Sequence, residues 1–298
     1  MKTITLTNGY EIPAMGFGTF PQKESLLDSV PAAMACGCRL IDVSDNYGNE
    51  RFAGEGMARG GGNAAITVVT KFSQPLRTGA LEKCFTASER KLGGRIDIYL
   101  LHWPFPFLWK EQWRRMEDIY LAGRCKAIGV CNFDARKLRE LLEFCRVKPA
   151  IDQFERHPLF QQNETASFCR RNGIVVMCYS PFARMDPLLM HDDTLEEIAR
   201  AHKKTVGQVI LRWSLEHGDV PIPASRFPDH IASNFSVFDF SLCDEEIRRI
   251  DALDAGHRVR FDPDKRFSLR DKARFLRARA KLSLKDLLRR CSGKWRRA

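Results

Sequence analysis

The chain has 298 residues, ten cysteines and a formal net charge of +11. It contains no run of about 20 apolar residues, which a membrane-spanning helix would need. Its first residues, MKTITLTNGYEIP, lack the apolar segment of a secretory signal, and no CxxC pattern predicts a metal site. We therefore expect a cytoplasmic protein with reduced thiols and no bound metal.

The positive charge is concentrated at the C-terminal end of the chain. Residues 264–298 contain 14 Lys and Arg against 3 Asp and Glu, which accounts for the whole net charge. The preceding residues hold equal numbers of basic and acidic side chains, so the chain as a whole gives no reason to expect a nucleic-acid partner.

The sequence predicts an α/β fold of regularly alternating strands and helices. A hairpin with its turn at Asn8-Gly9 comes first. Eight strand–helix repeats then favour a (β/α)8 TIM barrel over a doubly wound open sheet, because no G-x-G-x-x-G follows the first strand. The expected strands are Met15–Thr19, Arg39–Val43, Ile66–Lys71, Asp97–His102, Lys126–Val130, Ala150–Phe154, Ile174–Ser180 and Val220–Pro223. The expected helices include Lys23–Cys36, Leu81–Leu92, Gln112–Leu121, Ala135–Cys145, Asn163–Arg171 and Leu195–Ala201.

Four polar residues lie at or just after the ends of neighbouring strands: Asp42, Tyr47, Lys71 and His102. Together they indicate a proton-donating site, in which a Lys ammonium lowers the phenol pKa from its ordinary value of about 10. A neutral imidazole could bind the substrate oxygen. Taken singly, the residues also fit a buried ion pair, a loop aromatic and a core histidine.

At these residues the chain resembles the aldo-keto reductase family. The motifs that match occur in family order between Thr7 and about Phe267. They are MGFGT (15–19), IDVSDNYGNE (41–50), VTK (69–71), LLHWP (100–104), GVCNF (129–133), DQFERHP (152–158), YSPF (179–182) and PIPAS (221–225). The resemblance implies an NAD(P)H-dependent oxidoreductase with a barrel domain at 1–267. It also implies that Tyr47 is the general acid, Lys71 lowers its pKa, Asp42 pairs with Lys71, and His102 orients the carbonyl.

The resemblance also assigns residues to the nicotinamide end of the cofactor. Tyr179 matches the ring that stacks on the nicotinamide, and Asn132 and Gln153 match its carboxamide partners. The third partner is usually a serine, where this chain has Cys131, a weaker hydrogen bonder. The turn beside the diphosphate is matched by Ser180, Pro181 and Phe182.

The chain departs from the family pattern after the last strand. Ala224 and His230 replace a Lys and an Arg that would bind the 2′-phosphate of NADPH, while Ser225 and Asn234 match. Arg226 offers a replacement cation. We expect NADPH as the cofactor, with NADH or dual use left open, because charge-assisted phosphate contacts are the strong ones.

Substrate recognition is weakly encoded in the sequence. Phe20, Trp103 and Trp109 are expected to wall an apolar pocket, although packing between helices and barrel explains such aromatics equally well. Small aldehydes, ketones and keto-sugars are the admitted substrates. The alternative to an enzyme is a nucleotide-binding regulatory or redox-sensing barrel with little turnover.

Residues 268–298 form a separate basic extension with a helical pattern. Its apolar stripe comprises Leu269, Ala273, Leu276, Ala280, Leu284 and Leu287. Three interpretations stay open: packing of the stripe on the barrel, contact with an anionic membrane surface or acidic partner, and a solvated arm. The second would make the cytoplasmic protein peripheral to a membrane.

Overall fold

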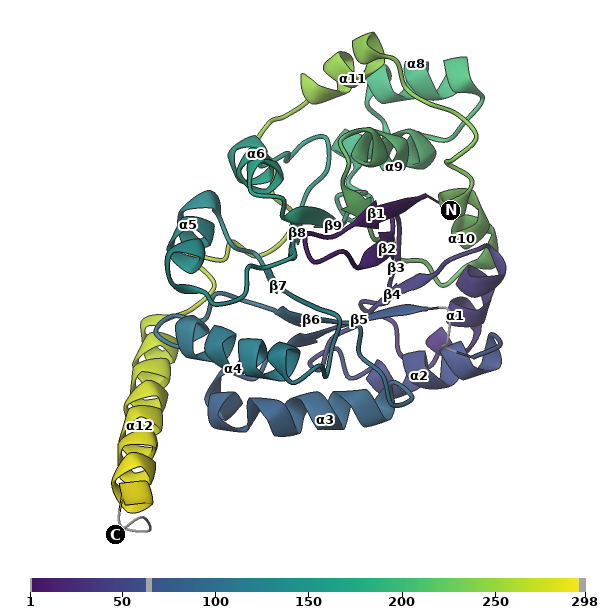
Figure 1. Ribbon diagram of the computed structural model, residues 1–298. Helices are drawn as coiled ribbons and strands as arrows, with labels where there is room; N and C mark the ends of the chain where they lie inside the picture. The colour runs from purple at the N-terminus through teal and green to yellow at the C-terminus, as the bar shows by residue number, and fades with distance from the viewer. Residues whose placement is uncertain (1, 63–65, 295–298) are drawn as a thin grey trace.

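The computed structural model describes residues 2–62 and 66–294, with side chains as far as Leu284 (Figure 1). Its centre is a sheet of eight parallel strands in which each strand pairs with the next along the chain. The strands are β3 (Phe17–Gly18), β4 (Leu40–Asp42), β5 (Thr67–Phe72), β6 (Ile98–Leu101), β7 (Ala127–Cys131), β8 (Ile151–Glu155), β9 (Val175–Tyr179) and β10 (Val220–Pro221). The predicted strands are thus confirmed to within a few residues at each end.

Backbone hydrogen bonds between the first and last strands close the sheet into a barrel. Gly16 N–H donates to Pro221 O at 3.1 Å, and Gly18 N–H donates to Pro223 O at 2.9 Å. A Cβ at Gly18 would stand 2.6 Å from the Ile222 carbonyl oxygen, so only glycine permits this close approach of the two strands. The (β/α)8 prediction is therefore confirmed.

Helices cover the outside of the barrel (Figure 1). Eight follow the strands in turn: α1 (Leu26–Ala35), α2 (Glu50–Arg59), α3 (Leu81–Lys91), α4 (Trp109–Leu121), α5 (Ala135–Phe144), α6 (Asn163–Arg171), α9 (Val206–Glu216) and α10 (Pro228–Phe235). Additional elements are η1 (Pro75–Ala80), α7 (Pro187–Met190), α8 (Asp193–His202) and α11 (Asp244–Asp251). Local capping explains several starts; the Thr205 hydroxyl, for example, accepts from Gln208 N–H in a capping box before α9.

The N-terminal hairpin closes one end of the barrel and leaves the other end open. Strands β1 (Thr3–Thr5) and β2 (Glu11–Pro13) pair antiparallel across the predicted turn, where Gly9 has a φ of 81°. Leu6 and Ile12 are buried against residues that begin the barrel strands, such as Leu40 and Ile98. The carboxyl ends of the strands, where the predicted polar residues lie, therefore face the open end.

The basic extension is a helix, α12 (Leu269–Lys294), whose far end projects from the barrel (Figure 1). The predicted stripe does not make the contact, because the side chains of Leu269, Leu276 and Leu284 are 85%, 52% and 57% exposed. Instead Phe275 is buried, with its ring 5.8 Å from that of Phe105. The helix is rotated relative to the prediction, so that Phe275 lies on the face that packs against the barrel. Leu287 lies outside the described side chains. Among the described residues, no helix combines the length and apolarity that crossing a membrane requires.

One buried carboxyl group in the barrel wall lacks a well-formed hydrogen bond among the described residues. Asp152, on β8, is fully buried, and neither carboxyl oxygen has a hydrogen-bond partner within normal geometry among the described residues. Burial raises the pKa of Asp152 well above its ordinary value, and the nearby Phe133 N–H offsets this effect only in part. The carboxyl group therefore stays protonated in the folded protein when it would ionise in the unfolded chain.

We predict that Asp152→Asn stabilises the protein increasingly as the pH rises. The raised pKa means that the folded wild type binds a proton which the unfolded chain has lost above about pH 4, so wild-type stability falls with rising pH by up to about 1.4 kcal/mol per unit. Asparagine does not titrate, so the variant lacks this fall in stability with rising pH. Urea unfolding between about pH 5 and pH 8 measures the difference, with the exposed Asp229→Asn as control; parallel curves for Asp152→Asn and wild type would contradict the prediction.

Candidate active site

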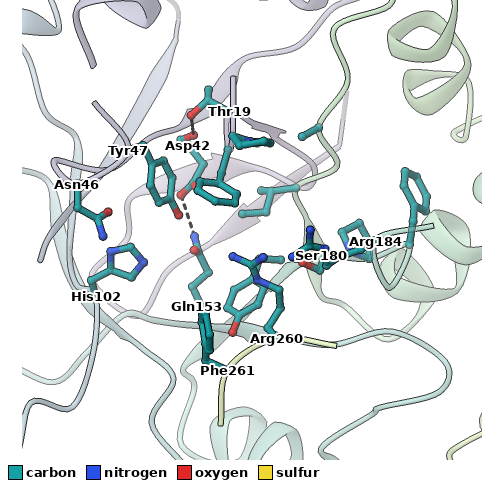
Figure 2. Close-up of a pocket in the computed structure, with 18 of the residues that line it drawn as sticks. Thr19, Asp42, Asn46, Tyr47, His102, Gln153, Ser180, Arg184, Arg260 and Phe261 are labelled. Atoms are coloured by element: carbon teal, nitrogen blue, oxygen red, sulfur yellow. Dashed lines mark hydrogen bonds between the residues drawn. The ribbon is translucent and has the colours of Figure 1, made fainter. Parts of the chain in front are cut away.

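A cavity of about 480 Å³ opens at the carboxyl ends of the strands (Figure 2). Residues at or after the carboxyl ends of six barrel strands (β3, β4, β6, β8, β9 and β10) and the segment after α11 contribute to its wall. They are Gly18, Thr19, Phe20, Pro21, Asp42, Asn46, Tyr47, His102, Trp103, Gln153, Tyr179, Ser180, Pro181, Phe182, Arg184, Met185, Ile222, Ala224, Arg260, Phe261 and Arg266.

A buried ion pair forms the floor of this cavity. The Lys71 Nζ donates to Asp42 Oδ1 at 2.6 Å and to the Val43 carbonyl at 2.8 Å, and its side chain is inaccessible to solvent. The other Asp42 oxygen accepts a hydrogen bond of 2.8 Å from Gln153 Nε2, drawn as a dashed line in Figure 2. Burial lowers the pKa of Lys71, whereas Asp42, followed by Tyr47 and Cys131, raises it, and together they leave this pKa above its usual value. Lys71 is therefore charged.

Tyr47 lies above this pair, with its ring centroid 5.1 Å from Lys71 Nζ. Burial raises the pKa of Tyr47 to about 12, although Lys71 acts to lower it. The sequence-based expectation of a lowered pKa is thus wrong in its net direction. The physical reason is that Asp42 neutralises much of the Lys71 charge, so desolvation of the phenolate dominates. The phenol keeps its proton at neutral pH.

His102 stands beside Tyr47, with the two ring centroids 5.7 Å apart and the rings nearly perpendicular. Burial, followed by the positive charges of Lys71, Arg266 and Arg260, holds the pKa of His102 well below its ordinary value. The imidazole is therefore neutral. Two hydroxyl groups fix its Nδ1: the Ser44 Oγ lies at 3.0 Å and the Ser73 Oγ at 2.5 Å. No described residue is hydrogen-bonded to Nε2, which remains for a ligand.

The residues expected at the nicotinamide meet at the ends of β7, β8 and β9. The Tyr179 hydroxyl donates to Asn132 Oδ1 at 2.7 Å, and Asn132 Nδ2 donates to the His102 carbonyl at 3.1 Å. Gln153 and Tyr179 line the cavity, as do Ser180, Pro181 and Phe182. Cys131 is fully buried below them, and burial raises the pKa of its thiol well above the usual range, so it stays protonated.

The residues expected at the adenine end lie at and before α10. Ala224 lines the cavity, whereas Ser225, Arg226, His230 and Asn234 lie beyond its wall. Arg226 and His230 are exposed; the guanidinium of Arg226 sits 4.9 Å from the centroid of the Phe227 ring, which also contacts the His230 ring at 5.4 Å.

Two of the three predicted pocket aromatics line the cavity, namely Phe20 and Trp103. Trp109 does not line it, because its ring is buried between Phe133 at 5.4 Å and Phe144 at 5.6 Å, where it packs α4 against the neighbouring α5.

The residues of the cavity wall that sequence reasoning did not assign to the site include Arg184, Met185, Arg260, Phe261 and Arg266. Arg184 and Met185 lie in a loop with positive φ angles of 60° and 63°, which no local sequence signal predicts. Arg260 and Arg266 follow the last barrel unit. The available signal was their alternation with aromatic residues in the segment Arg260-Phe261 and Arg266-Phe267.

Comparison with known proteins agrees with this geometry. The family model described as "Aldo/keto reductase family" matches residues 14–255. Glyoxal reductase from Bacillus subtilis (strain 168) is 38% identical over 270 residues, covering 88% of this chain and 96% of that protein. Morphine 6-dehydrogenase from Pseudomonas putida is 38% identical over 280 residues, covering 87% and 94%. The structure of a Bombyx mori aldo-keto reductase in complex with NADP matches with a TM-score of 0.83 at 30% identity, covering 88% and 96%. The chain therefore belongs to the aldo/keto reductase family and is an NAD(P)H-dependent oxidoreductase.

Proposed function

We propose that this protein reduces the carbonyl group of a small aldehyde, ketone or keto-sugar, with Tyr47 as the proton donor. One observation carries the proposal: a protonated phenol and a neutral imidazole face the same cavity above a buried, charged lysine. This arrangement provides two hydrogen-bond donors for one carbonyl oxygen and a route for its protonation.

The residues around Tyr179 fit a nicotinamide ring. The Tyr179 side chain lines the cavity beside Gln153, so an aromatic face and an amide are available together. Asn132 lies behind them, hydrogen-bonded to the Tyr179 hydroxyl. Relatives of known structure were solved with NADP or NADPH. When bound, the reduced nicotinamide supplies the hydride that the carbonyl carbon accepts.

The proton chemistry follows from the charges around Tyr47. Its phenol retains the proton in the resting site because burial makes the phenolate costly. Negative charge that develops on the carbonyl oxygen draws this proton, and the Lys71 ammonium then stabilises the phenolate. His102 orients the same oxygen through Nε2–H when the Ser73 hydroxyl donates to its Nδ1. Asp42 positions Lys71.

NADPH is the proposed cofactor, with its adenine end beside α10. Ser225, Arg226, His230 and Asn234 are the proposed contacts there, although His230 and Ala224 replace two cations of the family pattern. Arg226 is exposed and free of ion pairs among the described residues, so it can reach a 2′-phosphate. Because only one cation would pair with that phosphate, we expect the protein to prefer NADPH over NADH only weakly.

We predict that Tyr47→Phe lowers kcat by about 100-fold to 10,000-fold, because it removes the transferable proton. The Kd for NADPH should stay within about twofold of wild type, since the phenyl ring keeps the shape of the site. Stopped-flow reduction of 4-nitrobenzaldehyde and fluorescence titration measure the two quantities. Full activity in the variant would refute the role of Tyr47, and absence of turnover in the wild type with a carbonyl panel would favour a regulatory barrel.

We predict that the His102→Gln variant loses less stability than the wild type when the pH falls. The folded pKa of His102 is depressed, so the unfolded chain takes up a proton below about pH 6.5 that the folded protein refuses, and wild-type stability falls as the pH falls. Between about pH 7 and pH 5 the wild type should lose up to about 2 kcal/mol more than the variant. Urea unfolding at both pH values tests this, and equal losses would mean that His102 is protonated in the fold.

We predict that Ala224→Lys combined with His230→Arg tightens NADPH binding. Two charge-assisted contacts to the 2′-phosphate should lower the Kd for NADPH by about 10-fold to 100-fold. Each such contact contributes about 1.5–3 kcal/mol, from which the cost of ordering the two side chains is subtracted. The Kd for NADH should change by less than about twofold, because NADH lacks this phosphate. Quenching of tryptophan fluorescence reports binding, since Trp103 lines the cavity. Ala224→Gln with His230→Gln is the neutral control, and an equal gain for NADH would contradict the prediction.

A further inference from the structure

Two arginines from the segment after α11 reach the reacting end of the cavity. The guanidinium of Arg260 lies 5.1 Å from the centroid of the Phe20 ring, and this ring contacts Tyr47 at 5.0 Å. The guanidinium of Arg266 lies 4.1 Å from the Trp103 ring, which stacks on His102 at 5.6 Å. Each cation is therefore separated from one of the two proposed carbonyl-binding groups by a single aromatic ring.

Among the residues that the structure describes, neither arginine has a carboxylate partner. The two aspartates that lie between Arg260 and Arg266 in the sequence pair with other cations. Asp262 pairs with Lys265 at 3.8 Å, and Asp264 pairs with Lys137 at 2.6 Å. Within the described part of the chain, no acidic oxygen lies within ion-pair distance of Arg260 or Arg266.

The nearest buried acids are also occupied. Glu155 accepts hydrogen bonds from the backbone N–H groups of Val259 and Arg260 at 2.6 and 3.0 Å, which fixes the segment and leaves the Arg260 side chain directed to the cavity. Asp42 is the one carboxylate that lines the described cavity, and both its oxygens are bonded to Lys71 and Gln153.

The cavity therefore holds an excess of positive charge. Arg260 and Arg266 are half-buried, and the pKa of Arg266 is lowered by burial, with Arg260 acting in the same direction. The contacts of the two guanidinium groups with the Phe20 and Trp103 rings are cation–π interactions, which stabilise these side-chain positions. Such contacts explain why the side chains are ordered, but they leave the charge uncompensated. A guanidinium presents paired N–H donors that match a carboxylate or a phosphate.

We propose that Arg260 and Arg266 bind an anionic group, a carboxylate or a phosphate, on the substrate whose carbonyl lies at Tyr47 and His102. The inference rests on the proposed reductase function and narrows it to acidic carbonyl compounds. Because an aromatic ring separates each guanidinium from the carbonyl-binding groups, the anion is several bonds from the carbonyl carbon. A 2-oxo acid, whose two groups are adjacent, is too short to reach both sites.

Matched pairs of substrates test the proposal. The first pair is 4-carboxybenzaldehyde and the neutral 4-formylbenzamide, which have nearly the same shape; the second is glyceraldehyde 3-phosphate and glyceraldehyde. The wild type should show a kcat/KM at least about 10-fold higher for the acidic member of a pair, which corresponds to about 1.4 kcal/mol. A preference in the first pair alone identifies a carboxylate, and a preference in the second alone identifies a phosphate.

Variants then assign the preference to the two side chains. Arg260→Gln and Arg266→Gln should each lower kcat/KM for the preferred acidic substrate by about 10-fold or more, mainly through KM, and change the neutral partner by less than about threefold. Lys265→Gln is the matched control, because it removes one positive charge from the same segment on a side chain that is 86% exposed. It should leave the preference intact.

Three outcomes would overturn the inference. Equal loss for acidic and neutral substrates would mean that the arginines maintain the fold of the pocket. A rise in the Kd for NADPH in Arg260→Gln or Arg266→Gln, measured by fluorescence, with the substrate preference unchanged, would mean that they contact the cofactor. Good turnover of neutral substrates with no preference for acidic ones would remove the inference but leave the reductase proposal. The reductase proposal itself would fail if the protein bound NADPH but turned over no carbonyl substrate.

Discussion

The ion pair between Lys71 and Asp42 is the constraint on which the rest of the site depends. Removing two charges from water costs several kcal/mol per ion, which only close geometry and further hydrogen bonds can offset. Here the pair is 2.6 Å long, Val43 supplies a carbonyl to the ammonium, and Gln153 supplies an amide to the carboxylate. The interaction joins β4, β5 and β8 at the floor of the cavity. It also explains why the phenol above it stays protonated, because the two charges largely cancel at Tyr47 and burial decides the pKa.

Features that depend on local chemistry could be predicted from the sequence. The hairpin follows from Asn8-Gly9, since glycine adopts the positive φ that the turn requires. The barrel strands follow from short apolar runs whose neighbours in sequence become neighbours in the sheet. Because all parallel strands end at the same side of the barrel, the order of strands alone brings Asp42, Lys71 and His102 together.

Features that depend on packing between distant segments could not be predicted in this way. The direction of the Tyr47 pKa requires the depth of burial, which no spacing of residues gives. Trp103 and Trp109 are both tryptophans, so the sequence does not tell which of them lines the cavity. The position of α4 places the Trp109 ring against Phe133 and Phe144. The helical period of the C-terminal extension identified an apolar stripe, but Phe275 determines which face of α12 packs, because Phe105 and Phe267 offer an aromatic site for it.

The C-terminal segment connects the basic extension to the chemistry of the cavity. At one end, Glu155 holds the backbone of Val259 and Arg260. At the other end, Phe267 packs on Phe105 at 5.3 Å, so the residue next to Arg266 is held in place as α12 begins. A count of charges by sequence assigns Arg266 to a basic tail, whereas the fold places its guanidinium against Trp103 inside the cavity. The positive charge of this chain thus has two locations with different consequences. The exposed cations of α12 face solvent, where salt screens them, while Arg260 and Arg266 are half-buried in the cavity wall, where their attraction for an anion is screened less.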